Sequence, residues 1–464
     1  MRLVEPFVAR RVGAAKRLHG ELRLPSDKSI AHRALLFTAM ASGRADVVLR
    51  SPGMDVRATA AAVGQLGAFT ETRHEPGGTV RFGMAGGGSA TEASLPGRGA
   101  EMLDCLNSGT TARLLMGALS ARDGREATLT GDGSLSRRPM ERVAVPLREM
   151  GADVESTGGR LPVHVRGRRP LRAMAHRLPV ASAQVLGAIT LAAMAAEGRT
   201  TIETPGPTRD HTERMLAWLG VPITRDGNVT TVDGPTGMAA RSISVPGDLS
   251  SAAAWLVAGS VHPDAALRLV DVSLNPSRMA IVDVLRDMGA DIEVEEGAGS
   301  EGPEPAGDLL VRSAPAGLRA VSLSGAGIAA LIDELPLLAI AMAAADGVSE
   351  VRDAAELRVK ESDRIGRVVR NLRAIGIEAD ELPDGWRIQG TRAAGGLGGA
   401  PRRVRPTEPV EIQTGGDHRI AIAFALASAV GLAPEVEIDE PGCVDVSYPG
   451  FWAHLATLTS GEAA

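Results

Sequence analysis

The sequence predicts an α/β protein of two domains, each built from three similar units. At 464 residues the chain is long enough for at least two hydrophobic cores. A short phrase, in which a helix ends, a glycine turns the chain and a strand begins, recurs around Gly67, Gly151, Gly220, Gly289 and Gly376. Glycine suits the left-handed conformation that ends many helices. One such phrase is weak evidence, but five at similar spacing indicate a repeat.

The spacing of these glycines sets the expected domain organisation. Each unit spans roughly 70 to 90 residues and should hold helices and short strands. The last glycine leaves room for one more unit, which would end near His454 and Leu455. Three units therefore fall on each side of a point near the phrase Val245-Pro246-Gly247-Asp248.

Composition excludes several classes of function. The formal charge of −6 and the few aromatic residues (four Trp, one Tyr and six Phe) argue against a nucleic-acid surface. Cys105 and Cys443 are too few for a disulfide framework and are typical of a reducing cytoplasm. We expect no signal peptide, because charge and proline interrupt the first residues. No uncharged apolar stretch reaches about 18 residues, so the run from Leu335 to Ala345 predicts a buried core helix rather than a membrane span.

The stretch from Pro25 to Arg33 predicts a turn from a strand into an apolar helix. Free backbone N–H groups at such a helix start favour an anion. Lys28 adds a mobile positive charge and Ser29 a hydroxyl donor. Arg33 lies one helical turn beyond Ser29 on the same face.

Similar polar phrases open other helices. Asn107 to Arg113 joins a turn to an apolar helix, and its glycine would let a ligand approach the backbone closely. Ser136 to Met140 places two guanidiniums before a proline that can open a helix. Ser182 to Gln184 and Thr208 to Glu213 add polar side chains at two more turns. Each phrase alone also fits an ordinary charged surface.

The densest charged stretch runs from Glu356 to Arg364. On a helix or turn, Lys360 and Arg364 would share a face, with Glu361 beside them, although a salt-bridged helix surface fits equally well. Asp333 precedes one apolar helix, and the triplet Asp417-His418-Arg419 precedes another. Charged groups thus recur at the N-terminal ends of apolar helices. That pattern indicates a cleft that attracts a substrate with several negative charges.

Over nearly its whole length the chain resembles the 5-enolpyruvylshikimate-3-phosphate synthase family, in the phrases around Lys28, Asn107, Arg138, Gln184, Lys360 and His418. The resemblance implies a two-domain inverse α/β barrel, in which each domain has three βαβαββ repeats around buried helices. Residues 24–245 would form the domain on the shikimate 3-phosphate side. Residues 1–23 and 246–464 would form the domain on the phosphoenolpyruvate side, with the active site in the interdomain cleft.

The resemblance also implies a reaction. The family transfers the enolpyruvyl group of phosphoenolpyruvate to the 5-hydroxyl of shikimate 3-phosphate and releases phosphate. This step leads to chorismate and the aromatic amino acids, and it is the target of glyphosate. No metal or organic cofactor is implied, no nucleic acid or membrane partner is expected, and we expect a cytoplasmic monomer.

By similarity, the site residues fall into three groups. Shikimate 3-phosphate would be held by Ser29, Arg33, Ser182, Gln184, Arg209 and Lys360. Phosphoenolpyruvate would be clamped by Arg138, Arg364 and Arg419, with Gly109 behind it, and Asn107, Thr110, Ala183 and His418 would also bind substrate. Lys28 would bridge both substrates, and Asp333 and Glu361 would share the proton transfers that the reaction requires.

Several positions depart from the family pattern. Val446 stands where many members have a lysine before a phrase like Ser447-Tyr448-Pro449. The phrase Arg209 to Glu213 resembles the glyphosate-tolerant bacterial class. Ser26, Leu186 and Ser277 differ from that class, in which glycine, lysine and threonine respectively are usual, and Gly109 stands where some tolerant enzymes carry alanine.

Two other readings compete with the synthase. The related enolpyruvyl transferase that acts on UDP-N-acetylglucosamine uses a cysteine in a mobile loop, and neither Cys105 nor Cys443 lies in a comparable phrase. A catalytically inactive anion-binding protein could share the fold. Carboxylates such as Asp333 and Glu361 argue against it, because anion binding alone does not need them.

Overall fold

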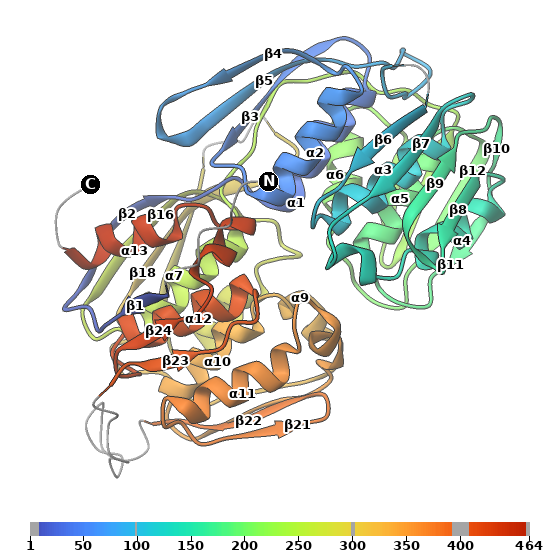
Figure 1. Ribbon diagram of the computed structural model, residues 1–464. Helices are drawn as coiled ribbons and strands as arrows, with labels where there is room; N and C mark the ends of the chain where they lie inside the picture. The colour runs from blue at the N-terminus through green and yellow to red at the C-terminus, as the bar shows by residue number, and fades with distance from the viewer. Residues whose placement is uncertain (1–8, 98–99, 298–301, 392–407, 461–464) are drawn as a thin grey trace. The chain divides into compact units, whose positions relative to one another are not determined.

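The computed structural model describes residues 9–97, 100–297, 302–391 and 408–460 (Figure 1). Contacts between Cα atoms divide the chain into two compact units. One comprises Pro25–Pro246 and Gly299–Pro305; the other comprises Met1–Leu24, Gly247–Ala298 and Ala306–Ala464. The sequence places 246–464 in a single domain, whereas the structure groups the described residues 302–305 with the other unit. The reason is that Glu304 is buried there, with one carboxylate oxygen 2.7 Å from Nδ1 of His211.

The unit around Pro25–Pro246 contains three described sheets. The first has the order β15-β3-β5-β4 and consists of Ile243–Ser244, Arg44–Arg50, Thr79–Ala85 and Phe69–His74. The second has the order β6-β7-β9-β8 and consists of Ala100–Asp104, Glu126–Thr130, Arg160–Arg166 and Asp153–Thr157. The third has the order β10-β12-β14-β13, with β11 also paired to β12, and consists of Leu171–Arg172, Ala196–Glu203, Val229–Gly234, Ile223–Asp226 and Ala175–Arg177.

The other unit also contains three described sheets. The first has the order β17-β18-β16-β2 and consists of Asp291–Glu296, Ala306–Arg312, Ala265–Ser273 and Leu18–Arg23. The second has the order β19-β20-β22-β21 and consists of Ser322–Leu323, Val348–Val351, Gly385–Gln389 and Ala379–Leu382. The third has the order β1-β24-β23 and consists of Arg10–Val12, Val436–Ile438 and Val410–Ile412.

Five of these sheets share one pairing pattern. A parallel pair, such as β6 and β7, continues into an antiparallel hairpin, such as β9 and β8. In three of the five sheets the parallel strands, β6 and β7, β10 and β12, and β19 and β20, are joined through a buried helix. In the sheet that contains β1, that N-terminal strand pairs antiparallel with β24 in the place that the hairpin takes elsewhere.

Helices of two kinds accompany the sheets. Six are buried over most of their length: α1 (Lys28–Met40), α3 (Gly109–Ser120), α5 (Ala183–Ala193), α7 (Leu249–Val261), α10 (Leu335–Ala344) and α12 (His418–Ala429). Six others are partly exposed: α2 (Met54–Gln65), α4 (Glu141–Glu149), α6 (His211–Trp218), α8 (Ala280–Met288), α11 (Arg364–Ala374) and α13 (Phe451–Ser460). A one-turn helix, α9 (Ile328–Leu331), precedes α10.

The sequence explains this division. Every residue of α10 is buried, as predicted for the apolar run that begins at Leu335. In α8, by contrast, Ile281, Leu285 and Met288 recur at helical spacing and are buried, while the opposite face is polar. Helices apolar on all sides therefore lie inside, and amphipathic helices cover them.

The five repeat glycines adopt the predicted conformation. Their φ angles are +87° at Gly67, +97° at Gly151, +90° at Gly220, +104° at Gly289 and +89° at Gly376. Each follows an outer helix and precedes a hairpin strand by a few residues. For all but Gly289 an added Cβ would meet no atom within 4 Å, so the positive φ, rather than crowding, favours glycine there.

Among the described residues, no single helix is long and apolar enough to cross a membrane. One pair of helical segments, Gly325–Leu331 and Leu335–Ala344, is long and apolar enough only when the two are taken together, and they are bent by 106° relative to each other.

Candidate active site

The starts of the buried helices carry most of the predicted site residues. The residue before each helix caps it, and in five of the six its side chain accepts a backbone N–H: Asp27, Ser108, Ser182, Asp248 and Asp417. Each cap satisfies one donor of the first turn and leaves others facing outward. These helix starts therefore combine positive backbone potential with the side chains of the polar phrases.

At the start of α1, two of the predicted cations make fixed contacts. Lys28 Nζ lies 3.1 Å from a carboxylate oxygen of Asp55, and its side chain is 29% exposed. Arg33 is buried; it donates from Nη1 to the Ser29 carbonyl at 2.9 Å and from Nε to the Thr212 hydroxyl at 2.8 Å. The predicted shared face of Ser29 and Arg33 is thus present.

The starts of α3 and α5 meet through side-chain hydrogen bonds. Gln184 donates to the Thr110 hydroxyl at 2.9 Å and accepts a hydrogen bond from Arg113. Arg138 donates to the Asn107 side-chain carbonyl at 3.1 Å. These contacts fix the amide of Gln184 and the guanidinium of Arg138 before a ligand arrives.

Gly109 lies between two of these guanidiniums. An added Cβ would be 3.0 Å from Arg113 Nη1 and 3.6 Å from Arg138 Nη1. Glycine therefore leaves space beside two cations at a helix start. Arg113 was absent from the residues predicted by similarity; its position one turn after Gly109, in the same phrase, was the available signal.

Ser182, Ala183 and Arg209 are the remaining predicted residues of this unit, and they lie at or just before the starts of α5 and α6. Ser182 caps α5 through the Val185 N–H at 3.4 Å, and Ala183 is the first residue of that helix. Arg209 is partly buried before α6, close enough to Arg33 for their charges to interact.

A buried histidine connects two of the helix starts. His32 Nδ1 lies 2.7 Å from the Thr59 hydroxyl, which is 2.6 Å from that of Thr111, and Thr111 donates to the capping Ser108 at 2.7 Å. Burial, followed by the charges of Lys28 and Arg33, lowers the pKa of His32 well below its ordinary value. A neutral imidazole therefore belongs to the support of these helix starts.

In the other unit, the predicted acids and cations form one cluster. Asp333 lies 3.7 Å from both Lys360 Nζ and Arg364 Nη1. Glu361 accepts from Arg364 Nη2 at 2.7 Å. Both acids are partly exposed, at 22% and 27% of the side chain, whereas Arg364 is 2% exposed. Two partly exposed carboxylates, Asp333 and Glu361, therefore contact the buried guanidinium of Arg364.

Arg364 is held by the cap of a buried helix. Its Nε and Nη2 donate to the two carboxylate oxygens of Asp417 at 2.8 and 3.2 Å. Burial alone would lower the pKa of Arg364, but the charges of Asp417, Glu361 and Asp333 raise it above its ordinary value. Burial would likewise raise the pKa of Asp417, yet Arg364 and then His418 lower it. The pair is therefore ionised on both sides.

Lys360 and Arg364 do not share one helix. A 3₁₀ helix, Ala355–Val359, ends before Lys360, and α11 begins at Arg364. Asp363 caps α11 by accepting the Gly366 N–H at 3.1 Å. The two cations nevertheless meet at Asp333, because the turn between the helices brings their side chains to the same carboxylate.

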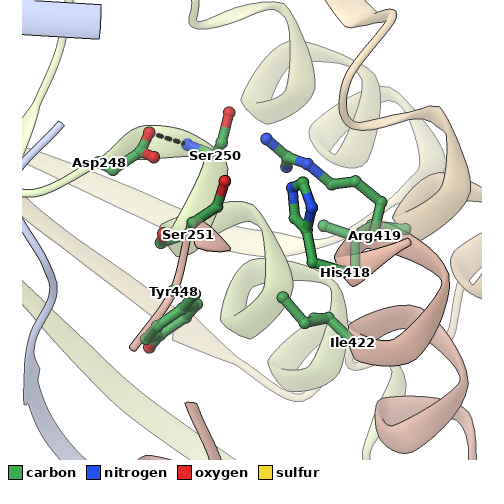
Figure 2. A pocket seen from close by; sticks show the side chains of 9 residues that line it. Asp248, Ser250, Ser251, His418, Arg419, Ile422 and Tyr448 are labelled. Atoms are coloured by element: carbon green, nitrogen blue, oxygen red, sulfur yellow. Dashed lines mark hydrogen bonds between the residues drawn. The ribbon is translucent and has the colours of Figure 1, made fainter. Parts of the chain in front are cut away.

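His418 and Arg419 line a small pocket between the starts of α7 and α12 (Figure 2). Ser250 and Ser251 contribute from α7, and Asp248 caps that helix. Figure 2 shows the Arg419 side chain extending from α12 toward Ser250, with the His418 ring beside it. The remaining lining residues are Leu337, Ile422, Ser447 and Tyr448.

Comparison with known proteins identifies the family. The family model "EPSP synthase (3-phosphoshikimate 1-carboxyvinyltransferase)" matches residues 12–455. A 3-phosphoshikimate 1-carboxyvinyltransferase from Gloeobacter violaceus is 45% identical to this chain over 446 residues, which cover 96% of this chain and 97% of that protein. Its counterpart from Thermus thermophilus is 43% identical over 447 residues, covering 96% and 97%. The chain belongs to the EPSP synthase family.

Solved structures of other proteins also resemble this chain over nearly its whole length. An EPSP synthase from Acinetobacter baumannii matches with a TM-score of 0.81 and 36% identity, over 97% of each chain. The enolpyruvyl transferase NikO from Streptomyces tendae matches with a TM-score of 0.73 but only 18% identity, over 98% of each chain, so that likeness concerns the fold alone. The mixed α/β class predicted from the sequence is confirmed.

The departures from the EPSP synthase pattern have local explanations. Leu186 is buried in α5 and belongs to the hydrophobic core of its unit. Ser26 donates to the Val245 carbonyl and accepts the Arg50 N–H, both at 2.9 Å, so it joins strand ends. Val446 ends a 3₁₀ helix, Pro441–Val446, and offers no charge.

No group of three or more His, Cys, Asp or Glu side chains that could hold a metal occurs in the described part of this EPSP synthase family member. Both cysteines are free thiols. Burial raises the pKa of Cys105 to about 12 and that of Cys443 to about 12. Neither thiol is ionised near neutral pH, so neither is a ready acid-base group there.

Proposed function

We propose that this protein is a 3-phosphoshikimate 1-carboxyvinyltransferase that transfers the enolpyruvyl group of phosphoenolpyruvate to the 5-hydroxyl of shikimate 3-phosphate and releases phosphate. Family membership over nearly the whole chain supports this activity. The cluster of Asp333, Glu361, Lys360 and Arg364 carries the proposal most directly, because it pairs two accessible acids with fixed cations.

The reaction forms a bond between the 5-hydroxyl oxygen and C2 of phosphoenolpyruvate. C3 must first gain a proton, and the hydroxyl must lose one. The bond from C2 to the phosphate oxygen then breaks, and C3 returns its proton to restore the double bond. We assign these proton transfers to Asp333 and Glu361, since both are partly exposed carboxylates that lie beside Arg364.

The cations account for the charges of the two substrates. We assign Ser29, Arg33, Ser182, Ala183, Gln184, Arg209 and Lys360 to shikimate 3-phosphate. We assign Asn107, Gly109, Thr110, Arg138, Arg364, His418 and Arg419 to phosphoenolpyruvate, and Lys28 to both. The proposal requires both units to act on the same pair of substrates, and the interdomain cleft expected from the sequence is part of it.

We also propose the inverse α/β barrel arrangement with three βαβαββ repeats in each domain. The shared pairing pattern of five sheets and the six buried helices support it. A cytoplasmic monomer completes the proposal, and the two free thiols fit a reducing compartment. Light scattering after size exclusion should give the mass of one chain.

A coupled phosphate-release assay tests the activity. Phosphate should appear only when shikimate 3-phosphate and phosphoenolpyruvate are both present. UDP-N-acetylglucosamine in place of shikimate 3-phosphate should give none, and treatment with iodoacetamide near neutral pH should leave the rate unchanged, because both thiols are protonated. No release with the two proposed substrates would favour the inactive anion-binding protein.

A further inference from the structure

Four polar side chains form a buried cluster at the start of α7. Ser250 donates to Oε1 of Glu334, and Arg278 Nη2 lies 3.2 Å from the same oxygen. Arg278 also donates to the Ser250 hydroxyl. The side chains of Arg278 and Glu334 are each only 3% exposed. Arg419 completes the cluster, with Nη1 4.0 Å from Glu334 Oε1.

A carboxylate buried to this degree requires a counter-charge. Arg278 supplies it, and the Asn275 side chain fixes the turn before Arg278 by accepting the Ser277 N–H at 2.8 Å. Ser250 bridges the acid and the base. Glu334 and Arg278 therefore neutralise one another, and the positive charge of Arg419 remains for a ligand.

Two adjacent acids thus have different surroundings. Asp333 is 22% exposed and lies between Lys360 and Arg364. Glu334, the next residue, lies against Arg278 and Ser250. The backbone turn before α10 separates an acid that is accessible from one that is enclosed.

We propose that Glu334, supported by Arg278 and Ser250, is a positioning residue that holds the Arg419 guanidinium in the orientation that binds phosphoenolpyruvate. The inference rests on the proposed function. Arg419 itself is mostly buried, with 10% of its side chain exposed, and Glu334 contacts it from the side of α10. Loss of the Glu334 charge would remove the carboxylate that both guanidiniums, Arg278 and Arg419, contact. The more exposed Arg419 would then turn away.

The decisive variant is Glu334→Gln, which keeps the shape and removes the charge. The KM for phosphoenolpyruvate should rise about tenfold or more, because small displacements of a binding group are costly. The KM for shikimate 3-phosphate should stay within about twofold, since a positioning defect at Arg419 affects one substrate. Glu437→Gln, the same change at the exposed pair with Arg11, is the matched control and should alter neither constant.

The double variant Arg278→Met/Glu334→Gln separates positioning from general stability. With Arg278 uncharged, the cluster loses its second cation, so the KM for phosphoenolpyruvate should fall back from that of Glu334→Gln. Losses that instead add, or that affect both substrates equally, would show a merely structural cluster and overturn the inference.

If Glu334→Gln does not fold, Ser250→Ala provides a second test, because it removes the hydroxyl between Glu334 and Arg278 without changing the charge of the cluster. It should raise the KM for phosphoenolpyruvate about threefold or more and leave that for shikimate 3-phosphate unchanged. An unchanged KM for phosphoenolpyruvate would count against the proposed cluster. An inactive wild type would refute the proposed function, whereas an active wild type with wild-type constants in all three variants would refute only this inference.

Discussion

Arg364 binds both carboxylate oxygens of Asp417, through Nε at 2.8 Å and Nη2 at 3.2 Å, and both side chains are almost fully buried. The same guanidinium donates to Glu361. Asp417 also caps α12 by accepting the Arg419 N–H at 2.9 Å. One buried acid thus sets the position of a cation that contacts a proposed catalytic acid.

Asp417→Asn should therefore be strongly destabilising. The change leaves Arg364 buried without its main counter-charge, and breaking a buried pair costs roughly 3–5 kcal/mol. The free energy of unfolding in urea measures this loss. Asp380→Asn is the control, because its 3.6 Å pair with Arg373 is exposed and should contribute at most about 1 kcal/mol. Equal losses in the two variants would contradict the role given to Asp417.

Glu361→Gln and Asp333→Asn should each lower kcat by about 100-fold or more, the usual scale for a positioned acid or base. Both changes preserve shape and remove the titrating oxygen. The KM values should change much less. Steady-state kinetics with both substrates decide this, and near-wild-type kcat in either variant would remove that residue from the proton transfers.

The buried His32 should make the protein sensitive to acid. Its folded-state pKa is depressed, by burial first and then by Lys28 and Arg33, below the unfolded value of 6.5. Below about pH 6.5 the unfolded chain binds a proton that the folded protein does not, so stability falls as pH falls, by up to about 1.4 kcal/mol per pH unit. At higher pH this stabilisation is fully present.

Urea unfolding of the wild type and His32→Gln between about pH 7 and pH 5 measures this effect. The variant should lose less stability on acidification, even if it is less stable throughout. His74→Gln, at an exposed histidine in β4, should keep the wild-type dependence. An identical pH dependence in wild type and His32→Gln would exclude His32 as the source.

Much of the fold could be predicted from local features. The helix-end glycines and the polar residues before apolar helices depend on neighbours within a few positions. Pairings over long distances could not be predicted, because they depend on tertiary contacts. β15 pairs with β3, and β2 pairs with β16, although each pair is separated by several intervening repeats.

The same limit applies to the site. Ser250, Arg278 and Glu334 are far apart in sequence and lie in otherwise apolar or turn segments, so their cluster gives no local signal. Arg113 was the exception, since it lies one turn from Gly109. Lys360 and Arg364 were expected on one face of a helix or a turn, and the structure has a turn there, because Asp363 caps a new helix that begins at Arg364.

The last prediction concerns glyphosate, an anion that in this family occupies the phosphoenolpyruvate site. The wild type should be inhibited, because Gly109 leaves open the space between Arg113 and Arg138. The tolerant-like phrase Arg209 to Glu213 does not oppose this. Its Glu213 is buried, with one oxygen 3.1 Å from Arg225 and 3.0 Å from the Thr230 hydroxyl.

Gly109→Ala should reduce this inhibition. The new methyl would be 3.0 Å from Arg113 Nη1, which must give way slightly, and in van der Waals contact with Arg138 Nη1 at 3.6 Å, so the space between the two guanidiniums narrows. A clash of one methyl costs roughly 1–3 kcal/mol, or about 5- to 150-fold in binding. The KM for phosphoenolpyruvate, the shorter ligand, should rise less than the inhibition constant. Gly133→Ala, whose Cβ would meet Arg137 Nη1 only at 3.8 Å, is the control. Inhibition constants measured at matched phosphoenolpyruvate decide the matter, and a wild type already resistant would mean that another residue narrows the pocket.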